Sequence, residues 1–141
     1  MRGILLDTNV LSELRKGERA DANVRRWFGS VDENMLFLSV LVTGEIRRGI
    51  EAIRKHDVRA ASALERWLEA LVRAHSDRVL PVDAAIADEW GRLDARGSLP
   101  VVDGLLAATA WVHDLTLVTR NLKDVARTGI DVLDPFASTS R

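Results

Sequence analysis

Four short apolar runs alternate with longer segments along this chain of 141 residues. The runs are GILL at 3–6, MLFL at 35–38, VLPV at 79–82 and LTLVT at 115–119, and DVL at 131–133 is a shorter fifth candidate. The segments between them place apolar residues three or four positions apart, which is typical of amphipathic helices. Short buried strands that alternate with helices predict an α/β fold, in which a parallel sheet is covered by helices on both faces.

The expected helices are bounded by capping residues and by glycine. They begin around 7–9 and run to 15, and further along the chain they cover 21–28, 39–55, 58–75, 84–96, 102–113 and 121–126. Pro81 favours an edge position for the third strand, because proline has no N–H to pair with a neighbouring strand. No repeat, low-complexity segment or linker interrupts the sequence, so we expect one domain over 1–136 and a short tail over 137–141.

The composition excludes several kinds of functional site, and the sequence indicates where the protein is expected to be located. The chain has no cysteine, which rules out disulfides, thiolate nucleophiles and cysteine-ligated metals. Its formal charge is −1, so binding to nucleic acid would need a local basic patch. We find neither an apolar stretch long enough to span a bilayer nor a signal peptide at the N-terminus, and we expect a cytoplasmic protein with no membrane partner.

The polar residues that follow the strands form the candidate site, because parallel sheets of this kind bind ligands at the carboxyl ends of their strands. Asp7 follows the first run directly, and Glu45 lies about a turn and a half into the helix after the second. Asn121 follows the fourth run, with Asp124 three residues later. Asp103 stands inside the apolar stretch LPVVDGLLAATA, which is an unusual place for a surface charge.

Several carboxylates at one edge of a sheet repel one another unless a cation neutralises them. Oxygen ligands suit a hard ion such as Mg²⁺ or Mn²⁺, and Mg²⁺ keeps several waters and takes one or two carboxylates directly. Such an ion can hold a phosphodiester oxygen, polarise the phosphorus and lower the pKa of a bound water. The pattern therefore favours phosphodiester hydrolysis.

Each of these acids also has a purely structural interpretation. Asp7 and Asp103 both fit helix N-caps, a position at which aspartate is common and is favoured by the helix dipole. Glu45 is followed by two arginines and fits a solvated helix face, and Asp124 next to Lys123 fits a surface pair. If the Asp7 carboxylate binds metal, we expect the capping role to fall to one of the two residues after it.

Further residues around the acids are candidates for support or for substrate binding. Thr8 and Asn9 can orient the carboxylate before them, and Thr119 ends a strand nearby, where β propensity alone also explains a threonine. Arg120 and Lys123 are placed to hold phosphates. Because the chain has no tyrosine and only three phenylalanines, it offers few aromatic side chains on which RNA bases could stack.

The segments LLDTNVLSEL, LSVLVTGEIRRGI, LPVVDGLLAATAWVHDLTLVTRNLKDV and DVLDPF occur in this order, and together they resemble the PIN-domain family. Within that family the chain is similar to the VapC and FitB group of toxin ribonucleases. The resemblance implies a three-layer α/β/α domain with a mostly parallel sheet of four to five strands, and endoribonuclease activity that depends on Mg²⁺ or Mn²⁺. It also implies neutralisation by a small VapB- or FitA-like antitoxin, a homodimer that forms a heterotetramer or larger complex with it, and DNA contact only through the antitoxin.

The resemblance also assigns roles to individual residues. Asp7 in LLDTN, Glu45 in VTGEI and Asp103 in VVDGLLAATA fall on the three acids of the family, which are catalytic and bind the metal. The fourth acidic position matches Asn121 in VTRN, so this chain has an amide there. An amide adds no charge, although Asp124 is placed to compensate. The amide at this position puts the binding of a second metal ion in doubt. It does not affect a first metal site built on Asp7 and Asp103.

Two other functions remain open from the residues alone. A phosphatase-like domain would use Asp7 as a nucleophile, but such enzymes usually carry an acid two residues later, where this chain has Asn9. A nucleic-acid-binding module without catalysis is the second alternative. It would be either a helix-turn-helix over 84–113 or a catalytically weak domain of the same fold, disabled by Asn121.

Overall fold

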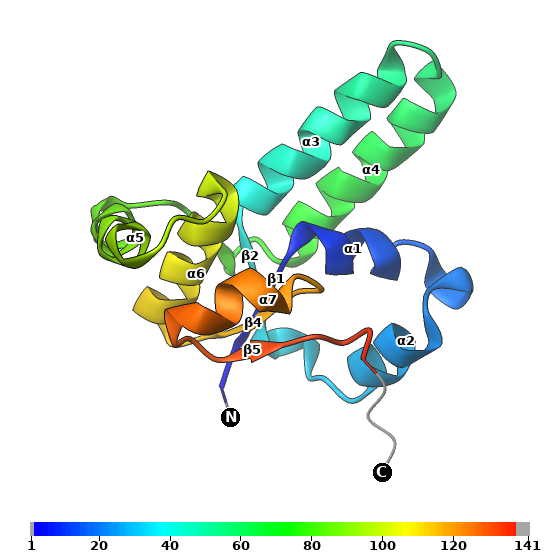
Figure 1. The fold of residues 1–141 in the computed structure, drawn as a ribbon. Helices are drawn as coiled ribbons and strands as arrows, with labels where there is room; N and C mark the ends of the chain where they lie inside the picture. Colours follow the sequence, from blue (N-terminus) through cyan, green and yellow to red (C-terminus); the bar gives the residue numbers. More distant parts are fainter. Residues whose placement is uncertain (1, 138–141) are drawn as a thin grey trace.

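The computed structural model describes residues 2–137 and is built on one parallel sheet with the strand order β3-β2-β1-β4-β5 (Figure 1). The strands are β1 (Ile4–Leu6), β2 (Leu36–Ser39), β3 (Val79–Leu80), β4 (Thr116–Val118) and β5 (Val132–Leu133). All four neighbouring pairs are parallel. The β3 strand lies at an edge, as Pro81 predicts, and residues 138–141 of the expected tail lie outside the described residues.

The helices lie in the segments between consecutive strands. They are α1 (Thr8–Leu14), α2 (Ala22–Gly29), α3 (Val40–Arg54), α4 (Val58–Ala74), α5 (Ala84–Arg96), α6 (Val101–His113) and α7 (Leu122–Val125). Three short 3-10 turns, η1 (Gly17–Arg19), η2 (Glu33–Met35) and η3 (Ala126–Thr128), were not expected from the sequence. No helix within residues 2–137 is long and apolar enough to cross a membrane.

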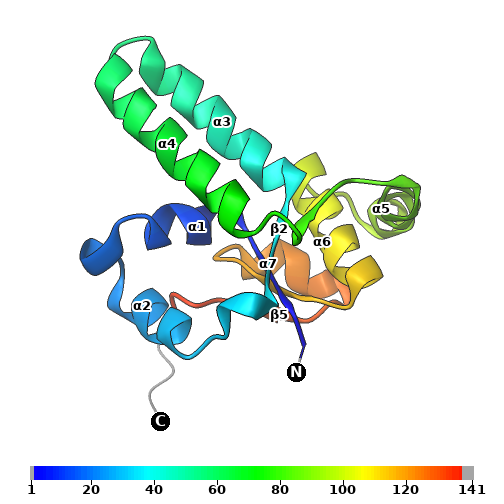
Figure 2. The same ribbon diagram turned by 180° about the vertical axis from the view of Figure 1, so that it is seen from behind.

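Helices cover the strands from both sides, which confirms the predicted α/β/α architecture. The pair α1 and α2 lies on one side of the strands and the pair α5 and α6 on the other (Figure 1). The antiparallel hairpin of α3 and α4 extends beyond the rest of the molecule, as the view from behind also shows (Figure 2). This coverage explains why the strands are continuous apolar runs, since Leu5, Leu38 and Leu117 in them are almost completely buried.

The chain changes direction across the sheet between β1 and β4. From β1 it proceeds outward to β2 and β3, and it then crosses to the other side of β1 to form β4 and β5. The carboxyl ends of β1 and β4 are therefore neighbours, and the backbone N–H of Asp7 donates to the carbonyl of Val118 at 2.9 Å. Such a switch point is where open parallel sheets bind ligands.

The helix-turn-helix interpretation of residues 84–113 is wrong. Helix α6 would be the recognition helix, yet most of its middle is buried, including Leu106, Ala108 and Ala110. A recognition helix has to present an exposed face to the major groove. The length and the small residues of α6 instead serve close packing against α5 and the sheet.

Candidate active site

Asp7 lies at the carboxyl end of β1, and its carboxylate is held by three donors. Oδ1 accepts from the backbone N–H of Thr8 at 2.7 Å, and Oδ2 accepts from the Thr119 hydroxyl at 2.7 Å. The Asn9 side-chain amide also points to Oδ2, at 3.5 Å. The residue is only 8% exposed, so these contacts fix the carboxylate in one orientation.

Asp7 itself caps helix α1, so the expectation that Thr8 or Asn9 would take that role is wrong. Its extended backbone, with φ −80° and ψ 160°, turns the carboxylate back over the first N–H of the helix. Capping occupies one lone pair of Oδ1, and a carboxylate offers about four acceptor sites. The structural and the chemical interpretations of Asp7 are therefore compatible.

Glu45 reaches the site from helix α3, which follows β2. Its Oε1 accepts a 2.5 Å hydrogen bond from the Thr8 hydroxyl, 37 residues earlier in the chain. Ser39 caps α3 as expected, and this start places the sixth helical residue over the end of β1. Glu45 is therefore part of a built contact and not simply a solvated helix charge.

Asp103 and Asn121 complete the site from the other side of β1. Helix α6 has Pro100 as its N-cap, so Asp103 is the third residue of the helix and not the cap that the sequence allowed. Its Oδ2 accepts from the Asn121 amide at 3.3 Å, and the backbone N–H of Asn121 donates to the Thr119 hydroxyl at 3.1 Å. The amide at the fourth position thus orients the acid at the third.

These contacts form one continuous hydrogen-bonded chain that joins β1, α3, β4 and α6. Its members in order are Glu45, Thr8, Asp7, Thr119, Asn121 and Asp103. Asn9 links the chain to Arg120, whose backbone N–H donates to Asn9 Oδ1 at 3.2 Å. The structure thus brings the catalytic candidates together with the supporting residues predicted around them, whereas their chemical roles remain predictions.

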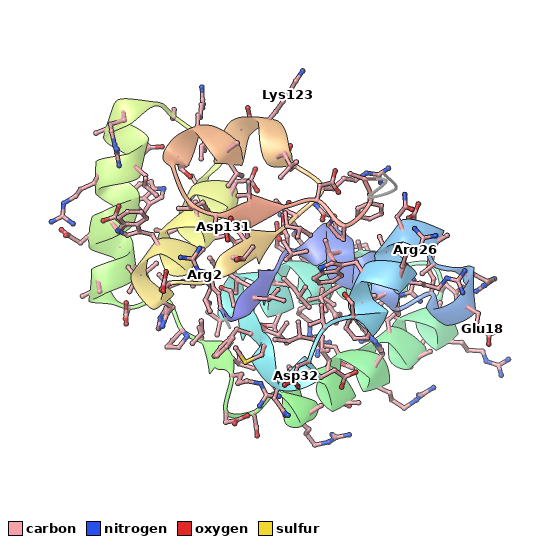
Figure 3. All side chains as sticks on the ribbon, turned by 90° about the horizontal axis from the view of Figure 1, so that it is seen from below. Arg2, Glu18, Arg26, Asp32, Lys123 and Asp131 are labelled. Carbon is pink, nitrogen blue, oxygen red and sulfur yellow. The ribbon has the colours of Figure 1, made fainter. Side chains whose placement is uncertain are left out.

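Burial and the negative charge of the site both raise the pKa of Asp103. Burial raises the pKa of its carboxyl, and the negative charges of Asp7, Glu45 and Asp124 raise it further, against a smaller opposing effect of the Asn121 hydrogen bond. Asp103 therefore lies close enough to the other three acids to be repelled by their charges. Asp124 is exposed on α7 and has no ion pair with Lys123 within residues 2–137, and Lys123 extends away from the molecule (Figure 3).

The chemistry of the donor set fits a hard divalent ion. Asp7, Glu45 and Asp103 supply only oxygen atoms, and an added positive charge would relieve their repulsion. Within the described part of the chain, no group of three or more histidine, aspartate or glutamate side chains lies close enough together to hold a metal ion as it stands. An open arrangement suits Mg²⁺, because this ion keeps several of its waters and binds few carboxylates directly.

Two contacts near the acids were not anticipated from the sequence. The Arg120 guanidinium carbon lies 4.4 Å from the centre of the Phe136 ring, so the segment after β5 contacts a residue next to the site. Gly104, next to Asp103, packs directly against Trp90 of α5, and a Cβ there would lie 3.0 Å from the indole. The glycine after the acid was a usable signal for close packing, whereas nothing local marks the Phe136 contact.

A family model described as the PIN domain matches residues 4–130 of this chain. A VapC ribonuclease of Sinorhizobium fredii is 32% identical over 94% of this chain and 97% of its own length. Toxin FitB of Neisseria gonorrhoeae is 28% identical over 94% of this chain and 98% of its own. The family model therefore covers the site residues from Asp7 to Asp124 and ends before Phe136.

Solved structures show the same relationship. The crystal structure of FitAcB from Neisseria gonorrhoeae matches with a TM-score of 0.86 and 27% identity, over 94% of this chain and 98% of that one. A toxin–antitoxin complex from Klebsiella pneumoniae matches with a TM-score of 0.65 and 27% identity, over 94% and 98% of the two chains. The sequence and the fold agree with these comparisons, and the chain belongs to the PIN-domain family, with VapC- and FitB-type proteins among its relatives.

Proposed function

We propose that this chain is an endoribonuclease that depends on Mg²⁺ or Mn²⁺ and hydrolyses phosphodiester bonds in RNA. The hydrogen-bonded chain from Glu45 through Asp7 to Asp103 carries the proposal, because it gathers three acids from three separate elements. A fold gains little stability from collecting like charges, so such a cluster is typical of a functional site. Similarity to a VapC ribonuclease supports the same activity.

Asp7 and Asp103 would hold the ion, with Glu45 beside them. When bound, the ion supplies a Lewis acid for a phosphate oxygen and lowers the pKa of its water. The remaining residues position these acids. Thr119 fixes Oδ2 of Asp7, and Asn121 fixes Oδ2 of Asp103 without adding a charge. Because burial and its neighbours raise the pKa of Asp103, this carboxyl holds a proton more readily than an ordinary aspartate when no cation is present.

Cleavage of a labelled single-stranded RNA tests this activity. The purified chain is expected to cleave with Mg²⁺, to stop in excess EDTA, and to lose activity in Asp103→Asn. Asp88→Asn is the matched control, since Asp88 is an exposed acid of α5 that pairs with Arg92 at 2.8 Å and lies outside the site. Equal cleavage with Mg²⁺ and with EDTA would contradict metal dependence, and full activity in Asp103→Asn would contradict the site.

We infer further that the chain is the toxin of a toxin–antitoxin pair. Its structural relatives include a toxin–antitoxin complex at 27% identity, which supports a small VapB- or FitA-like antitoxin as the partner, a homodimer as the core of a larger assembly, and DNA contact only through the antitoxin. A groove of about 440 Å³ between α1, α2 and α4 offers an apolar surface for an antitoxin segment. Its apolar lining includes Leu11, Leu14, Phe28, Trp67 and Leu71.

Expression in cells separates the toxin role from the activity itself. Wild-type chain is expected to arrest growth, and Asp7→Asn at equal expression is expected to permit it. Co-expression of a small protein encoded beside the toxin should restore growth, and Trp67→Leu should weaken its retention on the tagged chain. Equal growth with wild type and Asp7→Asn would contradict the toxin role and leave the cleavage result untouched.

A further inference from the structure

The guanidinium of Arg120 lies over the aromatic ring of Phe136, and Arg120 stands in the sequence between the two site residues Thr119 and Asn121. The guanidinium carbon lies 4.4 Å from the ring centre, which is within the range of a cation–π contact. Arg120 is exposed, and its guanidinium forms no ion pair with any acid of residues 2–137. The ring therefore covers one side of the guanidinium, and no carboxylate of residues 2–137 pairs with its charge.

Arg120 is held in place at the site by its two neighbours in sequence. Thr119 donates to Asp7 and Asn121 donates to Asp103, so the residue between them spans the two acids. Its own backbone N–H donates to Asn9 Oδ1 at 3.2 Å. The backbone of Arg120 is therefore held by the hydrogen bonds of the residue before it, of the residue after it and of its own N–H.

Phe136 is anchored independently of Arg120. The Asn23 side-chain amide of α2 donates to the Phe136 carbonyl at 2.8 Å, and the Phe136 N–H donates to Asp134 Oδ1 at 2.9 Å. Pro135 before it is buried, and the ring packs partly against the hydrophobic core. The backbone of Phe136 is thus held by hydrogen bonds at its N–H and its carbonyl, and its partly buried ring gives the Arg120 guanidinium an anchored surface to lie on.

We infer that the Arg120–Phe136 pair is a stacking platform for an unpaired base of the RNA that the proposed nuclease cleaves. A planar cation with one face on an aromatic ring presents its other face to solvent, and bases stack on guanidinium planes as well as on aromatic rings. A phosphate contact alone needs no ring behind the charge, and a lysine would serve it as a point charge. A base inside a duplex is already stacked on its neighbours and cannot reach such a surface, so the pair would take an unpaired base.

The inference rests on the proposed function, but its test does not require cleavage. Binding is measured in EDTA for two probes, a short single-stranded RNA and a ribose-phosphate oligomer of equal length that lacks bases. Arg120→Lys keeps the charge and removes the plane, and Arg66→Lys, at an exposed arginine of α4, is the matched control. Because stacking contributes about 1–3 kcal/mol per base, we expect Arg120→Lys to weaken RNA binding about tenfold.

The probe without bases is expected to bind wild type and Arg120→Lys within about twofold of each other. Phe136→Leu, which keeps an apolar side chain, should reduce RNA binding in the same direction, and both variants should lessen the quenching of a 2-aminopurine placed in the RNA. Equal losses for the two probes would make Arg120 a phosphate contact and overturn the inference. Unchanged RNA binding in Arg120→Lys, or no RNA binding by wild type, would also overturn it.

These outcomes are separate from failure of the proposed function. A chain that binds RNA through Arg120 in EDTA and still fails to cleave it with Mg²⁺ would contradict the nuclease proposal alone. A chain that cleaves RNA with Mg²⁺ but binds both probes equally well in wild type and Arg120→Lys would contradict the platform alone.

Discussion

The Thr119 hydroxyl donates a 2.7 Å hydrogen bond to Oδ2 of Asp7, across 112 residues of sequence. The hydroxyl oxygen of Thr119 also accepts from the backbone N–H of Asn121, so the Thr119 side chain joins both halves of the site. Thr119 is completely buried, which keeps water from replacing this contact. Orientation of the first acid therefore depends on the end of β4 and not only on β1.

Replacement of Thr119 by valine keeps the shape and removes this donor. Because hydrogen bonds to charged groups contribute about 1.5–3 kcal/mol, we expect the cleavage rate to fall about tenfold or more. Thr109→Val is the matched control, since the buried Thr109 hydroxyl donates only to the Leu105 carbonyl within α6. Single-turnover cleavage rates that are equal in the two variants would show that the hydroxyl does not serve Asp7.

Gly104 next to Asp103 is expected to tolerate no side chain. A Cβ there would lie 3.0 Å from both Cδ1 and Nε1 of Trp90, so in Gly104→Ala the indole has to shift by a few tenths of an ångström. Overpacking of this kind costs about 1–3 kcal/mol. Gly91→Ala on the facing helix meets nothing within 4 Å and should instead stabilise by about 0.5–1 kcal/mol.

Urea unfolding measures both effects, and the two variants should shift the midpoint in opposite directions. A Gly104→Ala variant as stable as wild type would mean that α5 and α6 adjust freely, and the position of Asp103 would then not depend on this contact.

The raised pKa of Asp103 predicts a stability change with pH. An acid whose pKa is higher in the folded protein than in the unfolded chain destabilises the fold once it is ionised, and acidification through the raised pKa relieves this cost. In EDTA, Asp103→Asn should therefore raise the free energy of unfolding at pH 7. The gain should shrink as the pH falls toward the ordinary aspartate value of about 3.9, because wild-type Asp103 then becomes neutral too.

Comparing wild type with Asp103→Asn removes the contribution that the other acids make to the pH dependence of the free energy of unfolding. Acid unfolding of wild type alone would include that contribution. Asp88→Asn should show no such gain at pH 7. A gain in Asp103→Asn that is absent at pH 7, or that stays constant down to pH 4, would contradict the repulsion among Asp7, Glu45, Asp124 and Asp103.

The amide at the fourth position can be converted to the acid that the family pattern has there. Asn121→Asp adds a negative charge beside Asp103, so the protein in EDTA should lose stability and the rise in Tm on adding Mg²⁺ should exceed that of wild type. Asn34→Asp adds the same charge in η2, before β2 and thus at the opposite edge of the sheet. Equal Mg²⁺ effects in the two variants would show that position 121 does not face the cation.

Most of the fold follows from local patterns, because buried strands and amphipathic helices are encoded over a few residues each. Helix α5 has the predicted bounds, and Ser39 caps α3 as expected. The three 3-10 turns escaped prediction, since a single turn leaves no periodicity to detect. Gly97 ends α5 as predicted, although its φ of 165° is extended backbone and not the left-handed conformation that glycine usually supplies at a helix end.

The site was predictable as a set of acids after strands, but not in its internal contacts. Sequence alone left the cap of α1 open among three residues, because the choice depends on the backbone angle at Asp7. The position of Asp103 in its helix was also open, since Pro100 can precede or cap a helix. The Arg120–Phe136 pair joins residues from different loops, so the composition, with no tyrosine and three phenylalanines, gives no sign that one phenylalanine contacts a residue next to the site.

The proposal that Asp7 holds the cation needed for RNA cleavage is tested most directly by comparing Asp7→Asn with Asp83→Asn. Both residues cap a helix through a side-chain oxygen, Asp7 for α1 and Asp83 for α5, and asparagine keeps that acceptor in each. Cleavage of single-stranded RNA with Mg²⁺ by the two purified variants should be abolished in Asp7→Asn and close to wild type in Asp83→Asn. Undiminished cleavage by a folded Asp7→Asn protein would contradict the claim.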